Sequence, residues 1–156
     1  MRIKNNQAIL NAPFGSILLT FADGDLIKCE LSEAAVEEDL GSFVGHKAVK
    51  ALQSYLKGDI HVLDSWKPSE DGTEFRRRVW KEIAKVRAGD TVTYGQIADS
   101  LDSSPRAVGS ACGDNPLPIF VGCHRVLGKS NLGGFAHSAE NVSIKCWLLK
   151  HEQQNM

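Results

Sequence analysis

The sequence lacks a long hydrophobic run, and this absence excludes several classes of protein. No stretch reaches the roughly 18 consecutive apolar residues that a membrane-spanning helix needs, so no membrane segment is predicted. Residues 1–6 lead into no long apolar stretch, which predicts no secretory leader. By default we expect a cytoplasmic protein, or a nuclear one in a eukaryote. The chain also contains no internal repeat and no low-complexity tract.

Cysteine is scarce, and none of the four cysteines belongs to a Cys-x-x-Cys pair. In a chain predicted to be intracellular, this argues against a disulfide framework. The five histidines do not fall at zinc-finger spacing from the cysteines. This spacing makes a structural zinc site the less favoured alternative. The cysteines are Cys29, Cys112, Cys123 and Cys146.

Size and charge are ordinary, but the charge is unevenly placed. The 156 residues are 42% hydrophobic, which suits one globular unit or two small ones. Residues 1–72 hold 7 basic and 11 acidic residues, a net −4, whereas residues 73–156 hold 11 and 8, a net +3. The second half is the better candidate for binding a polyanion, although an imbalance this small is weak evidence.

The first half is predicted to form a small sheet with one helix. Two apolar runs flank an Asp-Gly pair, which is typical of a hairpin turn. Apolar residues recur at helical spacing over 46–57, and a glycine follows that suits the end of the helix. The polar segment 67–72 predicts a boundary between an N-terminal α/β support domain, 1–71, and a second domain, 72–156. The predicted strands are 17–21, 26–31 and 60–63.

The second half is predicted to be mainly helical. Thr73 suits the N-cap of a first helix. Thr93 and Gln96 have the form of a capping box at the start of a second helix. Ser104 and Pro105 suit the N-cap and the first residue of a third. Two short helices joined by a tight polar turn are a helix-turn-helix candidate, although the pattern alone favours an ordinary helical hairpin. Residues 119–121 are a candidate strand, and a last helix is expected from about 141 to 152. The predicted fold class is α+β.

The dipeptide Cys123-His124 is the first candidate for chemistry. The nucleophilic form of cysteine is the thiolate, and a nearby imidazole can take the thiol proton. Neighbours on a strand point to opposite faces, so the two side chains cooperate only if the chain turns there or water relays the proton. Gly122 permits such a turn. By itself the dipeptide favours a simpler interpretation, a buried inert cysteine beside a surface histidine.

Several motifs of the second half occur together and in a fixed order. Residues 106–111 read Arg-Ala-Val-Gly-Ser-Ala, residues 115–119 read Asn-Pro-Leu-Pro-Ile, and residues 123–126 read Cys-His-Arg-Val. This ordered set resembles the O6-alkylguanine-DNA alkyltransferase family, densely over residues 72–152 and only loosely before them. Further matching segments are 72–75, 79–80, 93–98, 132–135 and 147–152.

The resemblance implies a DNA repair protein that is spent after one turnover and needs no cofactor or metal. It implies transfer of the alkyl group from O6-alkylguanine in double-stranded DNA, with O4-alkylthymine as a further candidate, onto Cys123. His124 would draw the proton from Cys123 through water, and Glu152 would orient His124. The thioether has no leaving group comparable to guanine, so the transfer would not be reversed. The implied catalytic residues are Cys123, His124, Glu152, Tyr94 and Asn115.

The resemblance also implies how DNA is bound, namely by a helix-turn-helix in the minor groove, with the damaged guanine flipped into a pocket. Arg106 would fill the space left in the base stack. Tyr94 would help to flip the nucleotide and would donate a proton to the purine. Asn115 would link the recognition helix to the active-site segment. The implied DNA-binding residues are Arg106, Tyr94, Ala107, Gly109 and Ser110, the implied pocket residues are Val126, Phe135, Ala136, His137 and Pro118, and the implied state is a monomer.

This sequence departs from the family pattern at three places. The usual proline before the cysteine is Gly122, which loosens the backbone at the active-site turn. Ala136 and His137 stand where the family has a serine followed by glycine, and the stretch between Cys123 and Glu152 is slightly longer than is typical. These departures leave open a related protein that binds the same lesions with weak or no transfer, although that group carries tryptophan in place of the cysteine.

A transcriptional regulator is a third candidate, because helix-turn-helix domains often regulate genes. Fused regulators in the family carry a cysteine-rich zinc domain, and no such cysteine cluster is present in this sequence. The regulator is therefore the least favoured of the three interpretations.

The first testable prediction concerns the size of the alkyl group. We hypothesise that His137 narrows the alkyl pocket, because the glycine that the family has at this position leaves room for the alkyl group. We expect methyl to be removed from O6-methylguanine faster than benzyl is removed from O6-benzylguanine. The measurement is the rate of alkyl transfer from two duplexes that differ only in the adduct. Equal rates would contradict the prediction.

Overall fold

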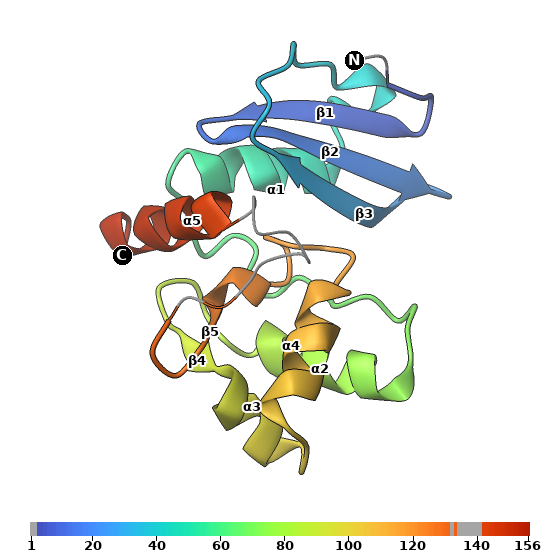
Figure 1. Ribbon diagram of the computed structural model, residues 1–156. Coiled ribbons are helices and arrows are strands. Elements are labelled where there is room, and N and C mark those ends of the chain that lie inside the picture. The colour runs from blue at the N-terminus through green and yellow to red at the C-terminus, as the bar shows by residue number, and fades with distance from the viewer. Residues whose placement is uncertain (1–2, 132, 134–141) are drawn as a thin grey trace.

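The structure, a computed structural model, describes residues 3–131, 133 and 142–156. A three-stranded antiparallel sheet and the helix α1 form one end of the molecule, and the helices α2, α3 and α4 form the other (Figure 1). The last helix, α5, lies beside α1, at the end that holds the sheet (Figure 1). This architecture confirms the predicted α+β class.

The sheet is built from consecutive strands. β1 (Gln7–Ala12), β2 (Gly15–Ala22) and β3 (Asp25–Ser32) pair in that order. Asp23 and Gly24 both have positive φ, 51° and 83°, as the favoured two-residue hairpin turn requires. The hairpin expected from the Asp-Gly pair is therefore confirmed, whereas β1 lies outside the sequence prediction.

The helix α1 (Lys47–Leu56) forms where helical spacing predicts it. The side chain of His46 caps its start by accepting the N–H of Ala48. After its end, Gly58 takes a φ of +117°, a conformation that suits glycine. The helix buries Ala48, Val49, Leu52 and Tyr55 in the core that it shares with the sheet. A short 3₁₀ helix, Gly41–Phe43, precedes it.

The helices α2, α3 and α4 each start at the cap that the sequence predicts. Thr73 caps α2 (Glu74–Ala84). Thr93 and Gln96 form a complete capping box at the start of α3 (Tyr94–Ser100). Ser104 caps α4 (Pro105–Gly113), with proline as its first residue. The two short helices α3 and α4 pack together in the expected helix-turn-helix order.

A short parallel pairing brings the start of α3 next to the active-site segment. β4 (Val92–Thr93) pairs with β5 (Val126–Leu127). Tyr94 follows β4 directly, and the 3₁₀ helix Cys123–Arg125 directly precedes β5. Because the two strands are parallel, Tyr94 lies beyond one end of this ladder and Cys123 beyond the other, and Cys123 is close enough to affect the pKa of Tyr94.

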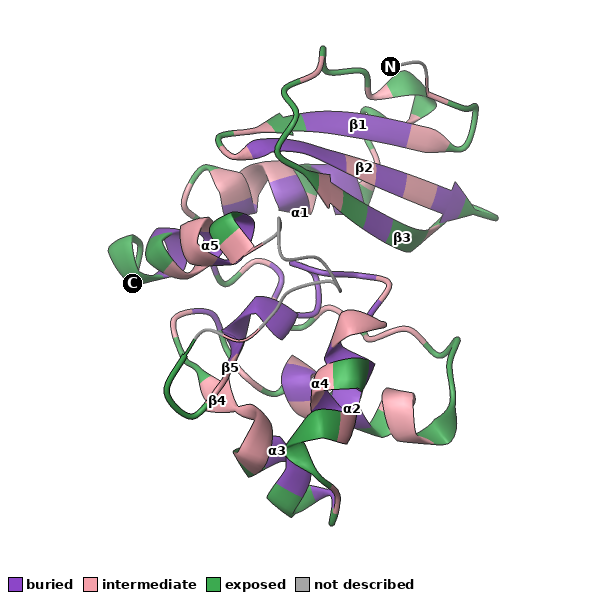
Figure 2. Cartoon of the chain, viewed as in Figure 1, coloured by how far each residue is buried: buried purple, intermediate pink, exposed green. Residues whose placement is uncertain are grey.

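The helix α5 (Val142–Gln154) packs against the N-terminal half. The ring of Phe14, between β1 and β2, meets the ring of Trp147 edge-on at 5.4 Å. One hydrophobic core includes residues of both halves, and Figure 2 shows buried segments in the sheet and in the helices. The division of the chain at residues 71 and 72 stays a prediction.

Two predicted strands are wrong. Residues 60–63 form turns, in which Ile60 and Leu63 are buried at a spacing of three while His61 is exposed. Residues 119–121 belong to a tight turn from Pro118 to Val121, and Ile119 has a φ of +74° that no strand adopts. Both segments are buried apolar runs, and burial alone does not distinguish a strand from a turn that faces the core.

No helix among residues 3–131, 133 and 142–156 is long and apolar enough to cross a membrane.

The N-cap of α4 offers a test of the fold. Ser104→Ala removes the side-chain oxygen that accepts the N–H of Ala107, so the free energy of unfolding should fall by about 1 kcal/mol. Urea denaturation measures it. Ser100→Ala is the matched control, because Ser100 only donates back to the carbonyl of Gln96 in its own helix, and its effect should stay within about 0.5 kcal/mol. Equal losses in the two variants would refute the role of the cap.

Candidate active site

Cys123 is held at the start of a 3₁₀ helix by the turn before it. Its side chain is 4% exposed. Asn115, just after α4, donates from Nδ2 to the carbonyl of Val121 at 3.1 Å and accepts the N–H of Leu117 at 3.1 Å. The same side chain lies near enough to the thiol of Cys123 to lower its pKa. Asn115 thus connects the end of α4 to the turn that precedes Cys123.

His124 and Glu152 form a buried pair. Nε2 of His124 lies 2.6 Å from Oε2 of Glu152, and neither side chain is more than 1% exposed. Because the carboxylate accepts, Nε2 carries the hydrogen, which makes Nδ1 the basic nitrogen of the ring. The chain turns at Cys123 rather than running straight, and this is one of the two conditions under which Cys123 and His124 can cooperate.

Arg125 binds the same carboxylate through two parallel hydrogen bonds. Nε donates to Oε1 and Nη2 to Oε2 of Glu152, both at 2.9 Å, while Nη1 donates to the carbonyl of Val86 at 2.8 Å. This bidentate geometry is among the strongest for an ion pair. A Cβ at Gly122 would lie 2.6 Å from Nη1 of Arg125. The glycine that departs from the family pattern leaves the space that the guanidinium occupies.

Two further donors complete the environment of Glu152. The hydroxyl of Tyr55 in α1 donates to Oε2 at 2.6 Å, and the N–H of Gly89 donates to Oε1 at 3.2 Å. Burial by itself raises the pKa of the Glu152 carboxyl, but the charges and hydrogen bonds of His124 and Arg125 lower it, and the pKa lies well below its ordinary value. Glu152 is therefore ionised at neutral pH.

Burial makes the thiol of Cys123 a weak acid in the free protein. It raises the pKa of the thiol to about 11, although the nearby side chain of Asn115 and the positive charge of Lys145 lower it. At pH 7 a pKa of about 11 leaves only about one thiol in ten thousand ionised. Burial also lowers the pKa of His124, although the charge and the hydrogen bond of Glu152 raise it. The imidazole is therefore neutral and can accept a proton. The thiol thus needs a proton acceptor, and the next residue, His124, is neutral and can serve as one.

Lys145 is a buried cation beside the thiol. Its side chain is fully buried, and Nζ donates to the carbonyl of Val126 at 2.7 Å and lies 5.7 Å from the ring centre of Tyr94. Burial lowers the pKa of Lys145, whereas the nearby cysteines, Cys123 first, raise it. Burial, with Cys112 and Cys123 nearby, raises the pKa of Tyr94 to about 12, so the phenol stays protonated and can donate.

Sequence reasoning missed the contributions of Tyr55, Gly89 and Lys145. Lys145 had a usable signal, because it lies three and seven residues before Leu148 and Glu152 and so shares their helix face. Arg125 stood in the Cys-His-Arg-Val motif without an assigned role. Tyr55 and Gly89 had no local signal, since their importance comes from contacts with a residue far along the chain.

The expected DNA-binding residues lie on the outer side of α4 and beside it. Arg106 and Ser110 are exposed, and Ala107 and Gly109 are half-buried. The opposite side of α4 is packed into the core through Val108, Ala111 and Cys112. A Cβ at Gly109 would lie 3.9 Å from the ring of half-buried Tyr94. The structure therefore groups the expected DNA-binding residues on one accessible side of the helical half.

The expected pocket is described only in part. Val126 and Pro118 are buried. Phe135, Ala136 and His137 lie outside the described residues. Gly133, which precedes them, has a φ of +70°, and a Cβ there would lie 2.6 Å from the hydroxyl of Tyr94. The one described residue of the Leu-Gly-Gly-Phe segment thus touches Tyr94.

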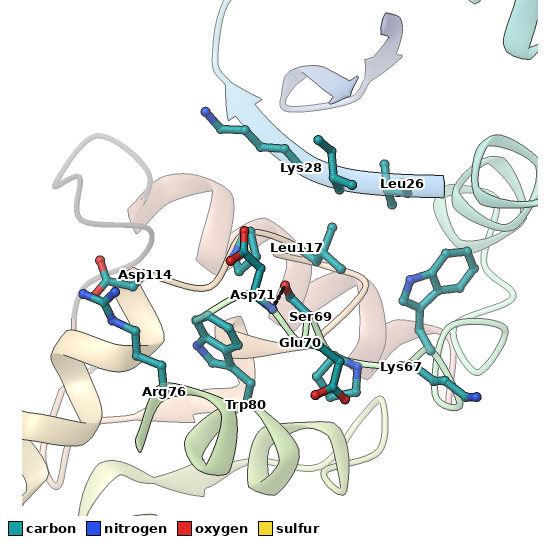
Figure 3. Close-up of a pocket in the computed structure, with 14 residues that line it drawn as sticks. Leu26, Lys28, Lys67, Ser69, Glu70, Asp71, Arg76, Trp80, Asp114 and Leu117 are labelled. Atoms are coloured by element: carbon teal, nitrogen blue, oxygen red, sulfur yellow. Dashed lines mark hydrogen bonds and ion pairs between the residues drawn. The ribbon is translucent and has the colours of Figure 1, made fainter. Parts of the chain in front are cut away.

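A groove of about 590 Å³ lies apart from these residues, between β3 and α2 (Figure 3). Leu26 and Lys28 of β3 face Trp80 and Arg76 of α2 across it, and the lining contains neither Cys123 nor its partners. Arg76 is paired with Asp114 at 2.8 Å. Within the described ranges, no three His, Cys, Asp or Glu side chains gather closely enough to hold a metal ion.

Residues 74–154 match the sequence model of the 6-O-methylguanine DNA methyltransferase DNA-binding domain. The chain belongs to this family. A methylated-DNA–protein-cysteine methyltransferase of Metallosphaera sedula is 37% identical over 131 residues, which cover 83% of each chain. A probable methylated-DNA–protein-cysteine methyltransferase of Acanthamoeba polyphaga mimivirus is 40% identical over 110 residues, 69% of this chain and 72% of that protein. The family expected from the ordered motifs is thus confirmed.

Solved structures of family members have the same fold. The O6-methylguanine methyltransferase of Mycobacterium tuberculosis superposes with a TM-score of 0.76 at 31% identity, covering 97% of this chain and 94% of that one. The M. tuberculosis OGT in complex with DNA superposes with a TM-score of 0.72 at 31% identity, covering 94% and 92%. The likeness extends over both halves of the chain, including the N-terminal half where the motifs are sparse.

The buried ion pair predicts a large loss of stability when its anion is removed. Glu152→Gln leaves Arg125 buried without its counter-charge, so the free energy of unfolding at pH 7 should fall by about 3–5 kcal/mol. The contribution of Glu152 is present above the pKa that its carboxyl has in the unfolded chain. It declines as the pH falls toward the lower folded-state pKa, because protonation removes the charge.

Urea denaturation at several pH values measures this effect. Glu82→Gln is the matched control, because Glu82 pairs with Lys85 in a solvent-accessible bridge. Its loss should be at most about 0.5 kcal/mol. A loss of that size in Glu152→Gln as well would contradict the assigned role of the carboxylate.

Proposed function

We propose that this protein repairs DNA by transferring the alkyl group of O6-alkylguanine in a duplex to the Sγ of its own Cys123. The observation that carries the proposal is the buried contact of 2.6 Å between His124 and Glu152, next to a cysteine whose preceding turn is connected to α4 by Asn115. Family membership supports the same reaction class, because relatives are named methylated-DNA–protein-cysteine methyltransferases. O4-alkylthymine is a second candidate substrate.

The proposed reaction begins with proton removal. Nδ1 of His124 takes the thiol proton of Cys123 through a water molecule, and Glu152 stabilises the imidazolium through Nε2. The charge of Lys145 and the nearby side chain of Asn115 favour the thiolate that results. Burial opposes it, so the thiolate forms mainly when a substrate is in place.

The thiolate then attacks the alkyl carbon. A new S–C bond forms as the C–O6 bond breaks, and O6 of guanine leaves with the electron pair. The phenol of Tyr94, still protonated because its pKa is raised by burial, donates a proton to the purine, and the proton that His124 accepted restores the phenol through water. The product is a thioether without a good leaving group, so each molecule acts once. No step uses a cofactor or metal.

The proposed DNA contacts follow from the accessible side of α4. This helix enters the minor groove, where Ala107, Gly109 and Ser110 allow close approach and Arg106 fills the gap left by the flipped base. The side chain of Arg106 is exposed in the second position of α4, where a long cation can reach the duplex. We propose that the protein binds as a monomer, and that it acts where the DNA is, in the cytoplasm or in a nucleus.

A Cys123→Ser comparison tests this function. After incubation with an O6-methylguanine duplex, the wild-type protein should gain one methylene by mass spectrometry, located on Cys123. Cys123→Ser should gain nothing but still bind the lesion, because the serine hydroxyl is far less acidic than the thiol. Cys146→Ser, which changes a partly exposed cysteine of α5, is the control and should be methylated like the wild type.

Other results would select the other interpretations. An unchanged wild-type mass with retained lesion binding would indicate a lesion-binding protein without transfer. A strong preference for one undamaged DNA sequence would indicate a regulator.

A further inference from the structure

The catalytic-site carboxylate receives a hydrogen bond from the other half of the molecule. We propose that Tyr55 is a positioning residue, whose hydroxyl fixes Oε2 of Glu152 and shares its charge, so that His124 is held as a neutral base for Cys123. The observation is the 2.6 Å bond from the Tyr55 hydroxyl to Oε2, across 97 residues of sequence. The inference rests on the proposed function, since it assigns Tyr55 to the same proton transfer.

The phenol is held in place from two sides. Tyr55 is fully buried near the end of α1. His151, the residue before Glu152, donates from Nε2 to the backbone carbonyl of Tyr55 at 2.6 Å, and the two rings meet edge-on at 5.2 Å. Consecutive residues of α5 therefore bind the hydroxyl and the carbonyl of one tyrosine. This arrangement allows the hydroxyl little freedom to leave Oε2.

Oε2 is the oxygen on which His124 depends. It accepts from Nε2 of His124, from Nη2 of Arg125 and from the hydroxyl of Tyr55. Burial, followed by the charge and hydrogen bond of Glu152, raises the pKa of the Tyr55 phenol far above its ordinary value. Tyr55 is therefore a neutral donor at every pH at which the protein works, and it adds no charge to the site.

Sharing the charge of Oε2 affects the basicity of His124. The charged groups that face His124 are Glu152, Arg125 and Lys145, and Asp64 lies 4.0 Å from Arg125. Of these, Glu152 alone favours the protonated ring directly. A hydrogen-bond donor on Oε2 weakens this stabilisation of the protonated ring by Glu152. It thereby keeps the imidazole of His124 neutral before the reaction. Without the donor, Glu152 should hold a proton on His124 more tightly, and the pKa of His124 should rise.

The proposal also gives the N-terminal half a chemical role. Asn115, Cys123, His124 and Arg125 all lie in the second half, within a few residues of one another or of α4. Tyr55 is the side chain of the first half that donates to Glu152. Correct docking of α1 against α5 therefore sets the orientation of Glu152, and through it the orientation of His124.

Tyr55→Phe tests the proposal, because it removes only the hydroxyl and keeps the ring. The first measurement is the titration of His124 in the full-length protein without DNA, by NMR of ¹⁵N-labelled histidine side chains. We expect the pKa of His124 to rise. The second is the rate of methyl transfer from an O6-methylguanine duplex against pH. We expect a loss of about five- to tenfold at neutral pH, the effect of one hydrogen bond, and an acid limb displaced toward higher pH.

His151→Phe is the matched control. It removes a second hydrogen bond between α1 and α5 and keeps an aromatic ring, and within the described part of the chain the side chain of His151 makes no hydrogen bond or ion pair with the Glu152 carboxylate. It should lower the free energy of unfolding about as much as Tyr55→Phe but shift the pKa of His124 much less, because the Tyr55 hydroxyl that donates to Oε2 is still present.

The outcomes separate the two levels of inference. If both variants shift His124 alike, or neither does, Tyr55 serves only to pack α1 against α5 and the proposal is overturned. If Tyr55→Phe shifts the pKa of His124 much more than His151→Phe does while the wild-type protein never gains a methyl group, Tyr55 tunes the histidine as proposed and the transferase function fails instead. If the shift and the slower transfer appear together, both are supported.

Discussion

A buried carboxylate that must be surrounded by donors organises this structure. Taking an ionised glutamate out of water costs several kcal/mol unless charges and hydrogen bonds replace the lost hydration. Glu152 receives five hydrogen bonds, from the side chains of Tyr55, His124 and Arg125 and from the N–H of Gly89. The donors come from α1, from the segment after α2 and from the 3₁₀ helix, while the carboxylate comes from α5. One charge therefore joins four parts of the chain, and each of them must be in place for the charge to be tolerated.

The same burial decides how reactive the cysteines are. Burial is the largest effect on Cys29, Cys112 and Cys123, and it raises the pKa of each thiol. What distinguishes Cys123 is its surroundings. The nearby side chain of Asn115 and the cations Lys145 and Arg125 reduce the effect, so its pKa rises less than those of the other two. The pKa of Cys123 is still raised, and this is useful in the proposed reaction. A thiol that stays neutral until His124 accepts its proton is protected from unwanted alkylation and oxidation.

Local chemistry was readable wherever neighbouring residues decide the structure. The caps at Thr73, Thr93 and Ser104 and the Asp-Gly turn act within four residues of themselves, and the structure has each of them where expected. The two wrong strand predictions concern segments whose structure is not decided by neighbouring residues alone. The buried run at 119–121 resembles a strand, yet it turns because Asn115 holds the carbonyl of Val121 and the N–H of Leu117 at once. The strand prediction for residues 60–63 is also wrong, because a turn with two buried apolar side chains has the same composition as a short strand.

The sequence by itself determined the family, the α+β class and the identity of the candidate nucleophile. It did so through motifs in a fixed order around Cys123, and these are visible without coordinates. His124 and Glu152 could be named in the same way. Only the tertiary structure decided what surrounds them, including Tyr55, which lies 97 residues before Glu152, and Gly89, which lies 63 residues before it. The physical reason is that a hydrogen bond depends on distances of about 3 Å in space. How α1 packs against α5 sets those distances, and no pattern within either segment records them.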